Sequence, residues 1–244
     1  MDAFRNTEEL LAWIIDFFAV SFGNSAILKG GMSLRLMHSP RYTNDVDYIF
    51  VPYDSKKDVK TLIEDKLINI ADLEFKSSLN SKALRILVSY RGQSAQIEVS
   101  AETECSSIPM SSSLLCTPYG HPPRIIRIME PSVAFAHKIA AWNERELMRD
   151  LYDIYIYESL FRIKPDIEIL NGRLKNARSY ANVSASKTIS KLIVKLRQIA
   201  NNLTEDSFTE LKPLLKEEEL AGLSFRMRPT LSSLCEHLEK TANE

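Results

Sequence analysis

The stretch that most constrains this chain is LKGGMSLRLMHSPRYTNDVDYIF, residues 28–50, which joins a glycine pair to two closely spaced aspartates. Apolar residues lead into Gly30-Gly31, and after a Pro-Arg break a second apolar run carries Asp45 and Asp47. If that run is a β-strand, its side chains alternate between faces, so both carboxylates project from the same side. The spacing therefore predicts a strand with two acids on one face of a sheet.

Each half of this stretch suits a different ligand: the aspartates suit a metal ion, and the glycine pair suits a phosphate. Two carboxylates on one sheet face repel each other unless a cation lies between them, and oxygen-rich pairs suit Mg²⁺ or Mn²⁺. A glycine pair where a strand meets a helix lets backbone N–H groups and the helix N-terminus approach a phosphate closely. A phosphate cradle and metal-binding carboxylates are the minimal requirements for phosphoryl or nucleotidyl transfer.

The overall composition is that of an ordinary globular protein. The 244 residues are enough for one large domain or two modest ones, and a net charge of −1 does not indicate a nucleic-acid partner. The charge is uneven, however. Residues 161–200 carry nine basic and two acidic residues, whereas residues 201–244 carry nine acidic and five basic ones. This asymmetry is a hint of an anionic partner and no more than that.

The three cysteines are an odd number without C-x-x-C spacing, which argues against a disulfide framework and a zinc site and favours a reducing compartment. The N-terminus lacks the basic region of a signal peptide, and the apolar run over residues 10–22 is too short to span a bilayer and contains Asp16. We therefore expect a cytoplasmic protein without a membrane segment.

Hydrophobic periodicity predicts that helices and strands mix in the first half of the chain. A capping signal at Asn6 and Glu9 opens a helix, a second helix follows the glycine pair, and a third is expected over residues 55–71. Strands are expected at residues 26–28, 46–51, 73–79, 83–90, 95–99 and 124–129. The Ser- and Pro-rich segment 103–123 is expected to be a long loop.

The strand expected at residues 95–99 carries a further acid. Ile97 and Val99 share one face of that strand, and Glu98 lies on the other. If this second face is the one that holds Asp45 and Asp47, Glu98 becomes a third carboxylate at the site.

From residue 130 onward the pattern is helical throughout. Helices are expected at residues 131–145, 147–161, 165–180, 184–202, 206–219 and 230–240. We therefore divide the chain into an α/β domain, residues 1–129, which carries the glycine pair and the aspartates, and a helical domain, residues 130–244. The expected fold class is α+β: a mixed sheet flanked by helices, followed by an all-helical C-terminal half.

Several motifs together resemble the AbiEii toxin family: LKGGMSLRL, RYTNDVDYIF, Lys138, and the run from Arg149 to Asp153. The resemblance covers about the first 160 residues. These proteins are nucleotidyltransferase toxins of type IV toxin–antitoxin and abortive-infection systems. They are related to the MenT toxins and belong to the superfamily that includes DNA polymerase beta. The resemblance implies a metal-dependent enzyme with a nucleotidyltransferase-like sheet and a cognate antitoxin as partner.

The resemblance also implies a metal site. Asp45, Asp47 and Glu98 would hold two Mg²⁺ or Mn²⁺ ions that align the NTP with an acceptor hydroxyl. Two positions depart from the family pattern. Met32 follows the glycine pair where the family often has Thr, and Glu98 stands where the family often has Asp.

The residues that the resemblance assigns to the NTP phosphates come from both halves of the chain: Gly30, Gly31, Ser33, Lys138 and Arg149. Asp150 would lie near the nucleotide and act with Lys138 as part of the catalytic set. Considered alone, Lys138 is better explained as a solvated lysine on a helix flank. Arg149 and Asp153 are four residues apart and could form an intrahelical ion pair.

By the same resemblance the substrate is an NTP and the acceptor is RNA, in particular the 3′ end of tRNA, whose modification would stop translation and growth. Lys187, Lys191 and Lys195 recur every four residues and would line one helix face, either as a solvated surface or as an RNA backbone contact. Two alternatives stay open. One is nucleotidyl transfer to a protein or a small molecule, and the other is a nucleotide-binding module without turnover.

Overall fold

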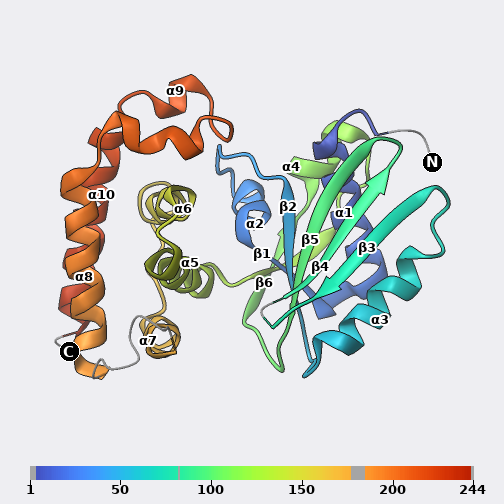
Figure 1. Ribbon diagram of the computed structural model, residues 1–244, viewed down its shortest axis with the longest axis horizontal. Helices are drawn as coiled ribbons and strands as arrows, with labels where there is room; N and C mark the ends of the chain where they lie inside the picture. Colours follow the sequence, from blue (N-terminus) through green and yellow to red (C-terminus); the bar gives the residue numbers. More distant parts are fainter. Residues whose placement is uncertain (1–3, 82, 177–184, 243–244) are drawn as a thin grey trace. The chain divides into compact units, whose positions relative to one another are not determined.

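The computed structural model describes residues 4–81, 83–176 and 185–242. The chain forms two compact units, residues 1–130 and 131–244 (Figure 1). The described residues of the first unit combine helices with a seven-stranded mixed sheet, and those of the second are helical and contain no strand. The α+β fold class expected from the sequence is therefore confirmed.

The first unit is built on a sheet with the strand order β3-β4-β5-β2-β1-β7-β6. β2 runs parallel to β5 and β1 runs parallel to β7, whereas the other neighbours are antiparallel. The strands are β1 (Ala26–Lys29), β2 (Asp45–Phe50), β3 (Leu73–Leu79), β4 (Leu84–Tyr90), β5 (Gln93–Ala101), β6 (Ser107–Ser111) and β7 (Ile125–Met129).

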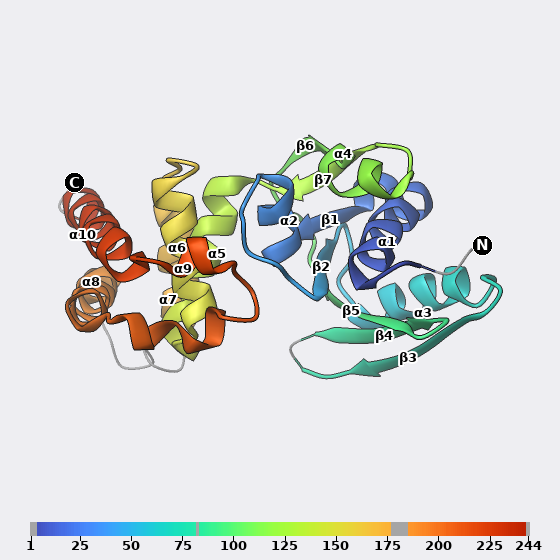
Figure 2. The ribbon, with the colours of Figure 1, turned by 90° about the horizontal axis from the view of Figure 1, so that it is seen from above.

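Helices α1 (Thr7–Phe22) and α3 (Lys56–Leu67) pack against the sheet and close the main hydrophobic core (Figures 1 and 2). The Asn6 side chain caps α1 by accepting a hydrogen bond from the backbone N–H of Glu9, as the sequence predicts. Ser55 caps α3 in the same way. The apolar stripes of both helices are buried with every second residue of β2, β4 and β5.

The other face of the sheet carries the polar residues of the same strands. β4 alternates between buried and exposed residues, so Arg85 and Leu87 point away from the core. In β2, Val46 and Tyr48 join the core, which places the alternating residues Asp45 and Asp47 on this second face. The face therefore runs from the two aspartates toward the β3 edge of the sheet.

The segment 103–123 is not the long loop that the sequence pattern suggests. Ser107–Ser111 form the edge strand β6 beside β7, and α4 (Ser113–Cys116) and a 3₁₀ turn (Thr117–Tyr119) follow. The prediction was wrong because Pro109 and the serines interrupt any apolar alternation. An edge strand tolerates proline and buries few side chains, because only one neighbour pairs with it.

The second unit contains helices that pack on one another. They are α5 (Pro131–Arg145), α6 (Met148–Ser159), α7 (Ile167–Lys175), α8 (Ala185–Asn202), α9 (Glu217–Leu220) and α10 (Leu223–Ala242). α5 has the bounds that its sequence pattern predicts, with Pro131 at its first position. The expected helix ends at residues 177–180 and 184 lie outside the described residues.

Two helix predictions in this unit were wrong. The single helix expected over residues 206–219 is a 3₁₀ segment, Glu205–Leu211, followed by the short α9. Pro213 lies between them and cannot donate a helical hydrogen bond. α10 begins seven residues before the expected Thr230 and continues through Pro229, which the sequence pattern treats as a boundary.

None of the helices in the described part of the chain has the length and apolarity needed to cross a membrane.

Candidate active site

Asp45 and Asp47 lie on β2, the strand at the centre of the sheet order. Both are half-buried, and both point to the face opposite the main core, as the period-two spacing predicts. Residues Asp45 and Asp47 pair in register with Gln96 and Glu98 of β5. The strand thus presents two carboxylates on one face with a third acid in the adjacent strand.

Gly30 fits against the Asp47 carboxylate. A Cβ atom on Gly30 would lie 2.1 Å from Asp47 Oδ2, and the backbone φ of Gly30 is +70°. Both the close approach and the left-handed backbone require glycine. Because Lys29 pairs with Asp47 across β1 and β2, the turn from β1 into α2 (Gly30–Leu36) begins beside this carboxylate.

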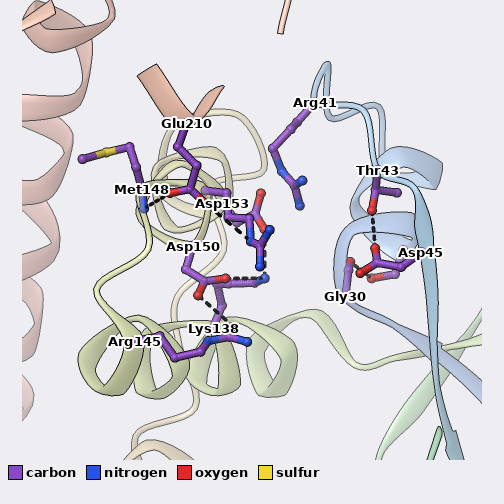
Figure 3. A network of polar contacts seen from close by, with 12 residues as sticks. Gly30, Arg41, Thr43, Asp45, Lys138, Arg145, Met148, Asp150, Asp153 and Glu210 are labelled. Carbon is purple, nitrogen blue, oxygen red and sulfur yellow. Dashed lines mark hydrogen bonds and ion pairs between the residues drawn. The ribbon is translucent and has the colours of Figure 1, made fainter. Parts of the chain in front are cut away.

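Gly31 also lies close to other side chains, those of two residues that precede the aspartates in the sequence. A Cβ atom on Gly31 would lie 2.9 Å from Arg41 Nη2 and 3.0 Å from Thr43 Oγ1. Thr43 Oγ1 donates a hydrogen bond of 2.5 Å to Asp45 Oδ1 (Figure 3). Arg41 is mostly buried and donates from Nη1 to the backbone oxygen of Tyr42. The hydroxyl of Thr43 therefore fixes one candidate metal ligand.

Arg41 and Thr43 were missed in the sequence analysis. The signal that could have found them is their spacing, because Thr43 and Asp45 are two apart and so lie on the same side of an extended chain. A threonine in that position can hydrogen-bond the acid that follows it.

Ser33 lies within α2 and is almost fully buried. Its hydroxyl donates a hydrogen bond of 2.8 Å to the backbone oxygen of Gly30. In this arrangement Ser33 stabilises the turn that carries Gly30. Its expected contact with a phosphate stays a prediction.

Glu98 faces the same side of the sheet as Asp47, its register partner. Its carboxylate also pairs with Arg85 of β4, with Nε 3.1 Å from Oε2. Within the described residues, no three acids, histidines or cysteines lie together as a ready metal site. Asp45 and Asp47 alone still suit Mg²⁺, which often binds one or two carboxylates together with substrate phosphates and water.

In the second unit, Lys138 forms a buried ion cluster. Its Nζ lies 3.2 Å from Asp150 Oδ1 and 2.9 Å from Asp153 Oδ2, and both carboxylates are almost completely buried (Figure 3). Arg145 Nη2 lies 2.8 Å from the second oxygen of Asp150, close enough for an ion pair although without hydrogen-bond alignment. The structure therefore brings together Lys138 and Asp150, two residues that the sequence analysis selected.

Arg149 does not pair with Asp153, the partner that helical spacing suggests. Its Nε lies 3.7 Å from Glu210 Oε1, and the other oxygen of Glu210 accepts a 2.8 Å hydrogen bond from the backbone N–H of Met148. Asp153 faces Lys138 of α5 instead. Glu210 thus holds the N-terminal turn of α6, a role that no sequence pattern indicated.

The lysines of α8 are partly used within their own unit. Lys195 Nζ donates a 2.6 Å hydrogen bond to the backbone oxygen of Asn143, lies 2.7 Å from Glu146 Oε1 and stacks over the Trp142 ring. The side chain of Lys187 lies outside the described part of the chain. The observed contacts of Lys195 give it a structural task at the C-terminal end of α5.

The fold is that of nucleotidyltransferase toxins. The nucleotidyltransferase toxin MenT4 from Mycobacterium tuberculosis H37Rv has a similar structure, with a TM-score of 0.63 and 16% identity over 97% of this chain and 86% of that one. JHP933 from Helicobacter pylori is similar with a TM-score of 0.53 and 13% identity over 99% of this chain and 97% of that one. At such identities the likeness shows the fold alone.

The chain belongs to the AbiEii nucleotidyl transferase toxin family of type IV toxin–antitoxin systems, whose family model matches residues 15–232. The protein is therefore a nucleotidyltransferase of the toxin class, as the sequence motifs suggested. Membership implies an NTP substrate and an antitoxin partner. No curated protein matches the chain significantly.

Proposed function

We propose that this toxin transfers a nucleoside monophosphate from an NTP to a hydroxyl at the 3′ end of RNA, with tRNA as the acceptor. The observation that carries the proposal is the pair Asp45 and Asp47 on one face of β2, packed against Gly30 and braced by Thr43. Two oriented carboxylates beside a glycine turn are what nucleotidyl transfer requires of its protein.

The proposal includes a divalent metal, Mg²⁺ or Mn²⁺, held by Asp45 and Asp47. The bound metal would activate the acceptor hydroxyl and neutralise charge on the leaving pyrophosphate. Glu98 would join the carboxylates once its ion pair with Arg85 opens. That pair is half exposed to solvent, so opening it costs about 0.2–1 kcal/mol.

The chain's own residues would position the reactants. Thr43 orients Asp45 by its hydrogen bond, and Gly30 leaves room for Asp47. We assign the NTP phosphates to the backbone of Gly30 and Gly31, and keep Ser33 as the residue that stabilises this turn or contacts a phosphate directly.

We further propose that the helical domain completes the active site. Lys138 would contact the triphosphate while Asp150 holds its ammonium in place, because two buried carboxylates fix the position of that ammonium. Arg149, whose side chain is half exposed, would add a second positive charge. In these roles Lys138 and Asp150 would act together as a pair rather than as two independent residues.

Transfer of nucleotides to the 3′ end of tRNA would block aminoacylation and stop growth, which accounts for the toxin class. Such an acceptor places the protein in the cytoplasm. A cognate antitoxin would neutralise it.

The proposal is tested by incubating the purified protein with each of the four α-labelled NTPs, total cellular RNA and Mg²⁺, with EDTA in a parallel reaction. We expect label in the tRNA fraction with at least one NTP and none in the presence of EDTA. Label on a protein or a small molecule instead would show that this molecule, and not RNA, is the acceptor. Tight NTP binding without any labelled product would show a binding module and overturn the proposal.

A further inference from the structure

The aspartate face of the sheet continues across β5, β4 and β3 as two rows of register partners. The first row is Asp47, Glu98, Arg85 and Ser78, and the second row is Asp45, Gln96, Leu87 and Lys76. Register partners point to the same face. Asp47 and Asp45 therefore each begin a row of side chains that ends at the edge strand β3.

The outer part of these rows is open. The side chain of Arg85 is 54% exposed and Leu87 is 47% exposed, although the residues on either side of them in β4 are fully buried in the core. Lys76 of β3 is also exposed. With strands about 4.8 Å apart, Arg85 lies two strands, about 10 Å, from Asp47, and Lys76 lies three strands, about 14 Å, from Asp45.

The two cations on this surface can take up an anionic partner. Among the residues that the structure describes, Arg85 pairs only with Glu98, in a partly exposed ion pair. Lys76 forms no ion pair with any residue that the structure describes. Arginine binds phosphate through two parallel N–H groups, and lysine binds it as a point charge.

On the side of β2 away from β5, the space beside the aspartates is occupied by the protein itself. Gly30 packs against Asp47, and Gly31 packs against Arg41 and Thr43, so β1 and α2 occupy that flank. An acceptor that crosses the surface of the first unit would therefore reach the aspartates from the β5 side.

We propose that the open face of β3, β4 and β5 holds the acceptor RNA strand, with Arg85 and Lys76 at its phosphates and Leu87 against a base. This inference rests on the proposed function and specifies where its acceptor lies. When Arg85 turns to a phosphate it leaves Glu98, whose carboxylate then stands beside Asp47 without a cation. Binding of the acceptor would thereby complete the set of three acids.

The test measures binding of a fluorescein-labelled single-stranded RNA oligonucleotide by anisotropy at several salt concentrations. The variants are Arg85→Gln, Lys76→Gln and the double variant. Lys57→Gln and Lys66→Gln are the matched controls, because both lysines are exposed on α3, which packs on the core side of the sheet. Leu87→Ala is compared with Leu79→Ala, an equally exposed leucine that pairs with the core residue Leu84.

We expect the double variant to bind RNA at least roughly tenfold more weakly than wild type. Its plot of log K against log salt should be less steep by about 1.4, which corresponds to the loss of two phosphate contacts on a single strand. Leu87→Ala should weaken binding at all salt concentrations without changing the slope. The control variants should bind as wild type does.

Different results would overturn the surface assignment and the proposed function. Wild-type protein that labels RNA, together with a double variant of unchanged affinity and slope, overturns the surface assignment and leaves the proposed function standing. Wild-type protein that neither binds nor labels RNA overturns the proposed function and the surface assignment with it. Binding of labelled NTP by Lys76→Gln and Leu87→Ala should equal that of wild type, and a loss there would contradict an acceptor role for these two residues.

Discussion

The carboxylate of Asp47 occupies the space into which a side chain on Gly30 would point, with Asp47 Oδ2 only 2.1 Å from the position of a Cβ atom. Asp47 lies on β2, and Gly30 directly follows the neighbouring strand β1, so the two residues meet where β1 turns into α2. Gly30 therefore makes room for the Asp47 carboxylate, and the position of that carboxylate depends on Gly30 having no side chain.

Replacing Gly30 by alanine should displace the Asp47 carboxylate and abolish most nucleotide transfer. The left-handed backbone costs about 1–2 kcal/mol for a residue with a Cβ atom, and the clash with the carboxylate adds to it. Urea unfolding and the labelled-transfer assay measure the two effects.

Gly120→Ala is the matched control. Gly120 has a similar φ of +77° but no atom within 4 Å of its Cβ position, so alanine there should cost only the backbone strain. In addition, Asp47→Ala should restore part of the stability lost in Gly30→Ala, because it removes the two closest atoms. Equal destabilisation by Gly30→Ala and Gly120→Ala, with transfer retained in both, would refute the Gly30–Asp47 relationship.

Lys138→Met should destabilise the helical unit by roughly 3 kcal/mol, because it removes the cation that two buried carboxylates share. Arg149→Met should cost less than about 1 kcal/mol, because its ion pair is long and half exposed. Thermal unfolding of both variants checks this. If Lys138→Met unfolds like wild type, the ion cluster is not structural.

The three cysteines should react with DTNB at very different rates. Burial raises the pKa of the Cys235 thiol to about 11, and it also raises the pKa of the Cys116 thiol. A raised pKa means less thiolate at pH 8, and both thiols are shielded as well. Cys105, which is partly exposed, should react first and the other two only on unfolding. Rapid release of more than one equivalent by the folded protein would contradict this packing.

The sequence predicted strongly patterned elements well. α5 was predicted with its observed bounds, and β3 likewise, because each combines a clear period with a boundary signal. β6 was missed because an edge strand needs little apolar pattern. The break near Pro213 had a local signal, the proline itself, which the prediction of one helix over residues 206–219 passed over. The continuation of α10 through Pro229 depends on tertiary packing, which local sequence does not report.

The candidate site was predictable in part for the same reason. Period-two spacing placed Asp45 and Asp47 on one face, and the register of β5 adds Glu98 to that face. The ion pair of Glu98 with Arg85 could not be foreseen, because it depends on which strand lies next to β5. The contact of Lys138 with Asp153 was hidden similarly, since the two residues come from different helices.

The central claim is that Asp47 is a catalytic carboxylate, and Asp47→Asn tests it most directly in the labelled-transfer assay. Asparagine keeps the shape of the side chain and removes its charge. The control is Asp72→Asn, which makes the same change at an exposed residue paired with Arg91. The account predicts the wild-type rate for Asp72→Asn and a loss on the order of a hundredfold or more for Asp47→Asn. Transfer by folded Asp47→Asn at the wild-type rate would contradict it.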